Sequence, residues 1–225
     1  MSPPLVVFDL DGTLVDTAPD LIDTLNIVLA HEGLPPVPYE TARNAIGGGA
    51  RRMVERALQA EGQPATATEL DRLFGHFLAH YGAHIADRSR PFPHMEAALD
   101  TLASRGYRLA VCTNKLEKLS VKLLDALGLS ARFVAICGQD TFGVQKPNPA
   151  ILHRTIERAG GSSQRAIMVG DSGTDIETAR TAQIPVIAVD FGYTEVPVTR
   201  LNPDRVISSF AALPEVVFDL IPFQS

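Results

Sequence analysis

The sequence predicts an α/β protein: a parallel β-sheet flanked by helices, with an all-helical unit inserted near its start. Two observations carry this prediction. Short apolar runs alternate with segments of helical periodicity over most of the chain, which is typical of parallel strands joined by crossover helices. Between about residues 16 and 90, in contrast, every periodic segment is helical and none has the pattern of a strand.

The strands are predicted from their length and their apolar composition. Leu5 to Phe8 is apolar at every position and stops at a polar, glycine-containing turn. This suits a central strand that is buried on both faces. Similar runs recur at Leu109 to Cys112, Phe133 to Ile136, Ala166 to Val169, Val186 to Val189 and, more weakly, Arg205 to Ile207.

The helices are predicted from apolar residues spaced three and four positions apart. Within the inserted unit, we expect Asp16 to cap a first helix whose apolar stripe includes Leu21 and Leu25, and Gly33 to end it. We interpret such stripes as packing between helices. The strongest amphipathic pattern of the chain is formed by Leu70, Leu73, Phe74, Phe77, Leu78 and Tyr81.

The composition narrows the class of protein. The chain of 225 residues has a formal net charge of −6 and no basic stripe, which argues against a nucleic-acid partner. No apolar run reaches the roughly 18 to 20 residues that a membrane span requires. Cys112 and Cys137 lie beside apolar residues, so we expect buried thiols in a reducing compartment. We therefore expect a cytoplasmic protein with neither a membrane nor a nucleic-acid partner.

The first segment that points to chemistry is Asp9-Leu10-Asp11-Gly12-Thr13, which directly follows the first predicted strand. Its two carboxylates would lie at the carboxyl edge of the sheet, where open α/β folds bind ligands. Like charges so close together are costly unless a cation compensates, and Mg2+ takes carboxylate and carbonyl oxygens as ligands. A simple Asx turn is the alternative interpretation of this segment taken alone.

A second acidic segment contains Asp171 and Asp175, follows another predicted strand and opens a helix. Carboxylates at the ends of two adjacent parallel strands could converge on one ion. The alternative is that Asp171 or Ser172 only caps the helix that follows. We favour convergence on a cation, because the first acidic segment stands in the equivalent place after its own strand.

Two further segments carry groups that suit a phosphate. Thr113 and Asn114 offer a hydroxyl and an amide after a predicted strand, although either residue is also typical of a plain helix cap. Lys146 lies in a loop stiffened by Pro147 and Pro149, and its ammonium could neutralise a carboxylate and a phosphoryl oxygen. For this lysine alone, a solvated surface position is the alternative.

These four segments, in this order and each at a junction from strand to helix, resemble the four signature motifs of the haloacid dehalogenase superfamily. The resemblance implies a Rossmann-like parallel-sheet core with an inserted all-helical cap domain. The core would comprise residues 1–15 and 91–225, and the cap would comprise residues 16–90.

The resemblance also implies a role for each matching residue. Asp9 would be the nucleophile that forms an aspartyl-phosphate, and Asp11 would be the general acid and base. Thr113 and Lys146 match positions that bind the phosphate, and Asn114 would assist them in binding the substrate. The implied Mg2+ site comprises Asp9, Asp11 through its backbone carbonyl, Asp171, and Asp175, which would support the metal or orient the lysine.

The cap segment from Ile46 to Leu58 is similar to the corresponding stretch of phosphoglycolate phosphatases. This similarity implies that the glycine loop, represented by Gly48, donates backbone N–H groups to a substrate carboxylate, and that Arg51 or Arg52 pairs with it. A flexible loop followed by a solvated basic turn is the alternative interpretation.

Taken together, the resemblance implies a Mg2+-dependent phosphatase of a small phosphomonoester, with 2-phosphoglycolate as the leading substrate. The alternatives are a sugar phosphomutase similar to β-phosphoglucomutase, a phosphatase of another small ester or of pyrophosphate, and a non-enzymatic phosphate sensor. Dehalogenase chemistry is disfavoured because that branch lacks the second aspartate. Phosphonate hydrolases of this superfamily need a lysine from the cap that forms a Schiff base with the substrate. Residues 16–90 contain no lysine, so phosphonate hydrolysis is disfavoured. We expect a small phosphorylated metabolite as the partner, and a monomer or homodimer.

Overall fold

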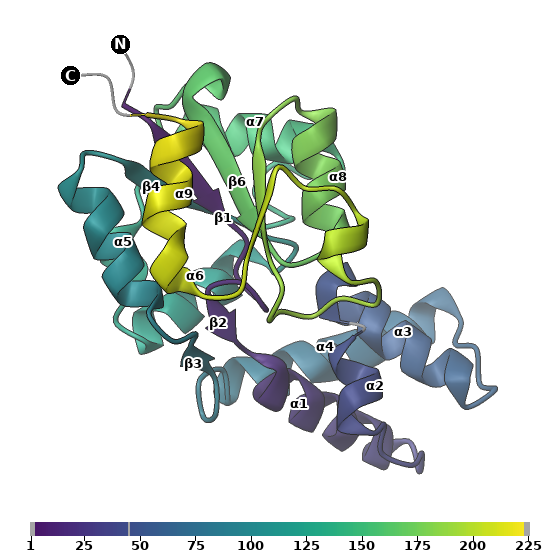
Figure 1. Cartoon of the computed structure of the whole chain (residues 1–225). Coiled ribbons are helices and arrows are strands. Elements are labelled where there is room, and N and C mark those ends of the chain that lie inside the picture. The colour runs from purple at the N-terminus through teal and green to yellow at the C-terminus, as the bar shows by residue number, and fades with distance from the viewer. Residues whose placement is uncertain (1–2, 45, 223–225) are drawn as a thin grey trace.

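The computed structural model of the chain describes residues 3–44 and 46–222. Within these residues, six strands form a parallel sheet in the order β5-β4-β1-β6-β7-β8, which confirms the predicted α/β class (Figure 1). Their bounds are β1 (Leu5–Phe8), β4 (Arg108–Cys112), β5 (Ala135–Cys137), β6 (Ala166–Gly170), β7 (Val186–Val189) and β8 (Arg205–Ile207).

One strand begins later than its apolar run suggested. The sequence predicts a strand from Phe133, but β5 starts at Ala135. The backbone N–H of Phe133 donates to the carbonyl of Ser130 at 3.1 Å, so this residue closes the preceding 3-10 turn. Apolar character alone therefore extended the predicted strand into the turn.

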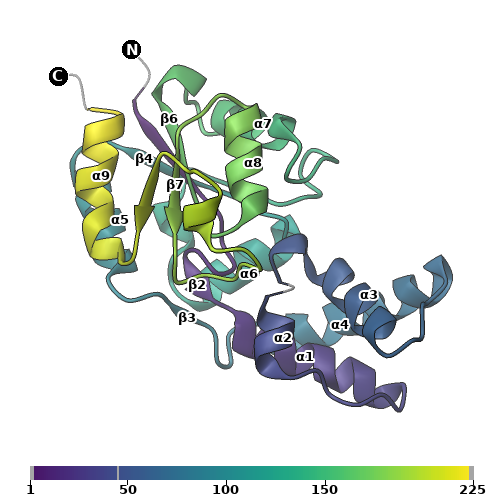
Figure 2. The same cartoon turned by 45° about the vertical axis from the view of Figure 1, so that its right-hand side comes forward.

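Helices cover both faces of the sheet, as Figure 2 shows with the strands between them. Val6 and Phe8 of β1 pack into one apolar cluster, and Leu5 and Val7 pack into the other. All four side chains are fully buried, which explains why this strand has no polar position. The first cluster includes α5 (Met95–Ser104), α6 (Glu117–Ala126) and α9 (Leu213–Leu220), and the second includes α7 (Pro149–Arg158) and α8 (Gly173–Thr181).

Residues 18–44 and 46–83 form a helical unit beyond the carboxyl ends of the strands (Figure 1). On α4, the residues at the predicted apolar positions divide into two groups. Leu70, Leu73, Phe77 and Tyr81 are buried, whereas Phe74 and Leu78 are only partly buried. A pocket is lined by Phe74, Phe77, Leu78 and Tyr81. The helices of this unit are α1 (Ala18–His31), α2 (Tyr39–Arg43), α3 (Ala50–Ala60) and α4 (Ala67–Ala83), with a 3-10 turn at Ile46–Gly48.

Two short strands connect the helical unit to the sheet. β2 (Val15–Asp16) leaves the sheet region and β3 (Arg90–Pro91) returns to it, and the two pair antiparallel. No sequence pattern predicted this pair, because two residues are too few to show an alternation of apolar and polar positions. The pairing holds the outgoing and returning segments side by side.

Asp16 does not cap the first helix, so this prediction was wrong. The N-cap position of α1 is Thr17, which makes no side-chain capping bond. The carboxylate of Asp16 instead accepts a hydrogen bond from the hydroxyl of Tyr193, which in turn accepts the backbone N–H of Ala18 at 3.0 Å. A partner far along the chain therefore replaces the local cap.

Asp20 on α1 binds the segment that leads into β3. Its buried carboxylate accepts the backbone N–H groups of Arg88, at 3.0 Å and 3.1 Å, and of Ser89, at 2.8 Å. The Ser89 hydroxyl donates to the same carboxylate at 2.6 Å.

Among the described residues, no helix is both long enough and apolar enough to cross a membrane.

We expect Asp20→Ala to lower the free energy of unfolding by about 2 to 4 kcal/mol, because buried N–H donors lose a charged acceptor. Urea denaturation of the purified variant measures this. Asp23→Ala is the matched control on the same helix: its ion pair with Arg88 is exposed, so a loss below about 1 kcal/mol is expected. Equal losses in the two variants would contradict a fastening role for Asp20.

Candidate active site

The turn after β1 brings the first acidic segment to the carboxyl edge of the sheet. Gly12 in this turn has a φ of 82°, in the left-handed region that favours glycine. A Cβ atom at this position would lie 2.5 Å from Oδ2 of Asp171. Glycine thus lets the backbone of the first segment approach the second acidic segment closely.

Carboxylates from β1 and its neighbour β6 converge, as the sequence predicts. Phe8, which precedes Asp9, pairs with Val169 in the register of these two parallel strands. The carboxylate oxygens of Asp9, Asp171 and Asp175 lie within 4.8 Å of one another, and all three residues are buried. Mutual repulsion makes such a cluster costly unless positive charge lies beside it.

Lys146 supplies positive charge at this cluster. Its Nζ lies 2.9 Å from Oδ1 of Asp9 and 2.5 Å from Oδ1 of Asp175. Although it belongs to a loop, the side chain is buried. Asn114 holds that loop, because its amide accepts the backbone N–H of Lys146 at 2.9 Å and donates to its carbonyl at 3.1 Å.

The electrostatics of the cluster remain unbalanced. Burial raises the pKa of Asp9 to about 6, even though Lys146 acts to lower it. Burial, together with the charges of Asp175 and Asp9, raises the pKa of Asp171 well above its usual value. Burial alone would lower the pKa of the Lys146 ammonium, but the carboxylates beside it raise it, so the lysine stays charged. One lysine does not offset three acids.

Asp175 orients its neighbours through both of its oxygens. Oδ1 faces Lys146 at 2.5 Å. Oδ2 accepts the backbone N–H groups of Asp171 at 3.2 Å and of Ser172 at 3.1 Å, together with the Ser172 hydroxyl at 2.6 Å. Of the two roles implied for Asp175, these bonds favour orientation of the lysine over direct contact with a metal.

Asp171 is held by residues that the sequence did not single out. The Thr13 hydroxyl donates to its Oδ1 at 2.8 Å, and the backbone N–H of Tyr193 donates to its Oδ2 at 2.6 Å. Arg43 from α2 donates to the carbonyls of Phe191 and Gly192, each at 3.0 Å. The loop that holds Asp171 is therefore tied to the helical unit. Thr13 stood within the first motif, whereas no local signal marked Tyr193.

The donor set fits a hard divalent cation. Buried carboxylate oxygens from Asp9 and Asp171 provide ligands of the kind that Mg2+ prefers. Burial is the main cause that raises the pKa of both carboxyls, and positive charge beside them would favour their charged forms. A cation between the two strand ends would supply that charge.

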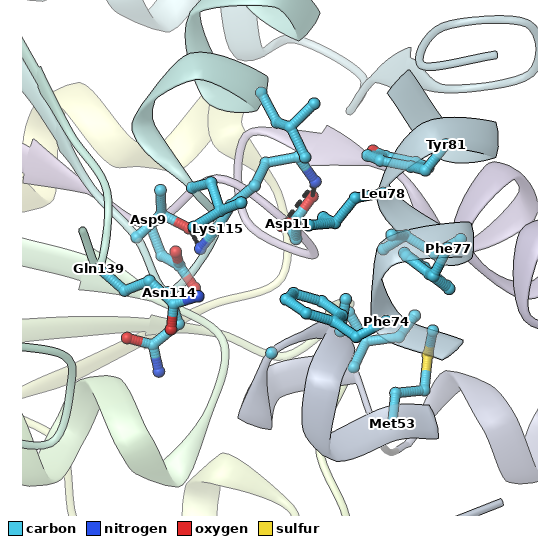
Figure 3. Close-up of a pocket in the computed structure, with 17 residues that line it drawn as sticks. Asp9, Asp11, Met53, Phe74, Phe77, Leu78, Tyr81, Asn114, Lys115 and Gln139 are labelled. Carbon is cyan, nitrogen blue, oxygen red and sulfur yellow. Dashed lines mark hydrogen bonds and ion pairs between the residues drawn. The ribbon is translucent and has the colours of Figure 1, made fainter. Parts of the chain in front are cut away.

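A pocket opens beside these acids, between the sheet edge and the helical unit. Asp9, Asp11, Thr113 and Asn114 line one side of it. Side chains from the helical unit, among them Phe74, face them from the other side (Figure 3). The structure therefore brings Asp9, Asp11, Thr113 and Asn114 to a common space, whereas Lys146 contacts Asp9 without lining the pocket itself.

Lys115 is a residue of this pocket to which the sequence assigned no role. Its Nζ lies 2.9 Å and 3.1 Å from the two carboxylate oxygens of Asp11, and both residues are largely buried (Figure 3). The Thr17 hydroxyl donates to the same carboxylate at 2.7 Å. The sequence signal that could have identified Lys115 was its position directly after Thr113 and Asn114.

The cap residues implied by the resemblance lie elsewhere. Arg51 is exposed and its guanidinium binds Asp71 at 2.7 Å, so it does not line the pocket beside the acids. Gly48 lines a separate hollow, together with Arg52. Gly49, the neighbouring glycine, does line the pocket.

Comparisons with known proteins agree with this geometry. Residues 6–189 match the family model of haloacid dehalogenase-like hydrolases. A phosphoglycolate phosphatase of Mesorhizobium japonicum is 52% identical over 213 residues, 95% of this chain and 94% of the relative. One of Agrobacterium fabrum is 49% identical over 216 residues, 96% and 93% of the two chains.

A solved structure is also similar over nearly its whole length. The crystal structure of a predicted phosphoglycolate phosphatase from Haemophilus somnus has a TM-score of 0.88 and 30% sequence identity, covering 96% of this chain and 98% of that one. The family match spans both acidic segments, Thr113, Lys146 and the helical unit. The chain therefore belongs to the haloacid dehalogenase-like hydrolases.

Proposed function

We propose that the protein is a Mg2+-dependent phosphatase that hydrolyses small phosphomonoesters, with 2-phosphoglycolate as its preferred substrate. The observation that carries this proposal is the convergence of Asp9, Asp171 and Lys146 at the ends of adjacent strands, with a pocket beside them. Relatives 52% and 49% identical bear the name phosphoglycolate phosphatase, which supports the substrate.

Asp9 is the proposed nucleophile. Its Oδ1 accepts the backbone N–H of Leu10 at 2.7 Å and lies 2.9 Å from Lys146 Nζ. Within the described part of the chain, Oδ2 is then the oxygen left to attack phosphorus. Attack forms the aspartyl-phosphate while the bond from phosphorus to the ester oxygen breaks.

Asp11 is the proposed proton carrier. It gives its proton to the departing ester oxygen and then takes one from the water that attacks the aspartyl-phosphate. This second attack releases inorganic phosphate and restores the carboxylate of Asp9. The position of Asp11 in the same pocket, two residues from Asp9, supports this division of roles.

Asp9, Asp171 and the backbone carbonyl of Asp11 are the groups that would hold Mg2+. When bound, the ion neutralises charge on the phosphoryl oxygens and on the attacking carboxylate. Lys146 adds a fixed ammonium to the same task, while Asp175 holds that ammonium in place. Thr113 completes the phosphate side of the pocket.

Residues 16–90 are the proposed cap domain, which closes over the substrate and excludes water during transfer. Pocket-lining side chains contributed by α3 and α4 support this role. A cytoplasmic location is part of the same proposal. It is supported by Cys112 and Cys137, which are both buried as free thiols.

Asp9→Asn is expected to lower kcat by at least about 1000-fold, because the amide is a poor nucleophile. Circular dichroism should show an unchanged fold. Asp219→Asn, which alters an exposed acid paired with Arg205, is the matched control and should keep its activity. Near-normal hydrolysis by Asp9→Asn would refute the assignment of the nucleophile.

Removal of divalent ions is expected to abolish phosphate release, and added Mg2+ to restore it, because the clustered acids need a cation. Asp171→Asn should raise the Mg2+ concentration required for half-maximal activity by about tenfold or more. A Mg2+ titration of both proteins measures this. Full turnover in the presence of a chelator would contradict the metal role of Asp171.

The substrate is tested by ranking kcat/KM over a panel of phosphomonoesters that includes 2-phosphoglycolate, small alcohol phosphates, pyrophosphate and hexose phosphates. We expect 2-phosphoglycolate to exceed the uncharged small esters by at least about tenfold. Isomerisation of a hexose phosphate without release of phosphate would instead establish the mutase alternative. Absence of hydrolysis across the whole panel would overturn the proposed function.

A further inference from the structure

The pocket beside Asp9 has two chemically different sides. The side formed by the sheet edge is polar, with Asp9, Asp11 and Thr113. The side formed by the helical unit is lined by apolar groups such as Met53 and Phe74 (Figure 3). A leaving group rich in hydroxyls would lose hydrogen bonds to water on entering this side and gain few in return. The pocket therefore favours a small leaving group with few polar atoms.

Lys115 is the exception to the apolar character of the pocket. Among the described residues that line it, Lys115 is the one with a cationic side chain. It is buried, and its Nζ contacts both carboxylate oxygens of Asp11. Burial would lower the pKa of this ammonium, but Asp11 and the nearby Tyr81 raise it, so Lys115 stays charged. A buried permanent cation facing the leaving-group side invites an anionic partner.

Tyr81 supplies a second polar group at the same place. Its ring lies 4.5 Å from Nζ of Lys115, measured to the ring centroid, and Figure 3 shows it beside the pair of Lys115 and Asp11. Only 1% of this residue is exposed, and within the described part of the chain its hydroxyl has no hydrogen-bond partner. Burial raises the pKa of Tyr81 to about 12, so the hydroxyl keeps its proton. A buried donor without an acceptor is costly unless a ligand provides one.

We propose that Lys115 and the hydroxyl of Tyr81 together bind a carboxylate on the leaving group of the substrate. The proposal rests on the proposed function and assigns its selectivity to these two residues. It accounts for both unusual features of the pocket, because one carboxylate offers an anion to the ammonium and an acceptor to the phenol.

The expected position of the carboxylate agrees with the proposed chemistry. Asp11 protonates the ester oxygen of the leaving group, so that oxygen lies against Asp11. In 2-phosphoglycolate a single methylene separates this oxygen from the carboxylate carbon. The carboxylate must then lie next to Asp11, where Lys115 Nζ is found 2.9 Å from an Asp11 oxygen. A longer leaving group would carry its charge past this lysine.

Binding of this carboxylate would also release Asp11 from its resting contact. Without substrate, the Lys115 ammonium holds Asp11 through both of its oxygens. A substrate carboxylate competes for the same ammonium and leaves the Asp11 carboxyl able to turn toward the ester oxygen. Lys115 would thus be a specificity-determining residue that also positions Asp11.

Arg51, for which the sequence suggested the same task, is less suited to it. Its guanidinium is exposed and already binds Asp71. An exposed arginine also discriminates weakly, because water screens its charge. Lys115 and Tyr81, in contrast, lie in the pocket and are shielded from water.

The test compares two substrates that differ in the carboxylate alone, 2-phosphoglycolate and 2-hydroxyethyl phosphate. For Lys115→Met we expect kcat/KM for 2-phosphoglycolate to fall by about 100-fold more than for 2-hydroxyethyl phosphate, because a charged hydrogen bond is lost. For Tyr81→Phe we expect a selective loss of about tenfold. In both variants the loss should appear mainly as a rise in KM for 2-phosphoglycolate. The unfolding midpoint of Tyr81→Phe should stay unchanged, because among the described residues the Tyr81 hydroxyl has no hydrogen-bond partner to lose.

The matched control for the lysine is Lys118→Met, which alters an exposed lysine on α6. The matched control for the tyrosine is Tyr107→Phe, which alters a buried tyrosine whose hydroxyl donates to the carbonyl of Ile221 at 2.7 Å. Both should keep the preference for 2-phosphoglycolate. Equal losses on the two substrates in Lys115→Met would assign the lysine to Asp11 alone and overturn the proposal. A selective loss in Arg51→Met instead would also overturn it.

The wild-type enzyme separates this inference from the function on which it rests. No hydrolysis of any phosphomonoester would overturn both. Hydrolysis of small esters without preference for the member that carries a carboxylate would overturn the inference and leave a phosphatase. Preference for that member, lost selectively in both pocket variants, would support the two together.

Discussion

The site depends on the burial of like charges around one ammonium. Three carboxylates meet within 4.8 Å, and Lys146 contacts two of them. Neither the acids nor the lysine would be stable there alone, because each buried charge needs its counterpart. The arrangement therefore constrains the rest of the fold: the register of β1 against β6, the glycine at position 12 and the Asn114 bonds to the lysine loop all hold these groups at contact distance.

The same surroundings give the acids different tasks. Both carboxylate oxygens of Asp175 accept hydrogen bonds, Oδ1 from Lys146 and Oδ2 from Ser172, so Asp175 holds these two residues in position. Asp9 lines the pocket and accepts the backbone N–H of Leu10, and Asp11, in the same pocket, pairs with Lys115. Identical side chains thus differ in role because their partners differ, and those partners come from separate strand ends. The sheet supplies a rigid frame, while the helical unit supplies the apolar wall opposite.

The sequence predicted what local patterns encode. Buried parallel strands leave uninterrupted apolar runs, and acids directly after two such runs indicated convergence at one edge, which the structure confirms for Asp9 and Asp171. Contacts between distant segments left no such pattern. The hydrogen bond from the Tyr193 backbone to Asp171 joins residues 22 positions apart. The hydrogen bond from the Tyr193 hydroxyl to Asp16 joins residues 177 positions apart. Likewise, periodicity placed Tyr81 on a helix face without showing that its ring would lie beside the Lys115 ammonium.

Arg43 links the helical unit to the centre of the sheet edge. Its two bonds to the carbonyls of residues 191 and 192 end one residue before the amide that holds Asp171, and its guanidinium also lies 5.1 Å from the centre of the Tyr193 ring. Swinging α2 outward must break these bonds beside a carboxylate of the acid cluster. Movement of the helical unit and the placement of the Asp171 carboxylate are therefore coupled through Arg43.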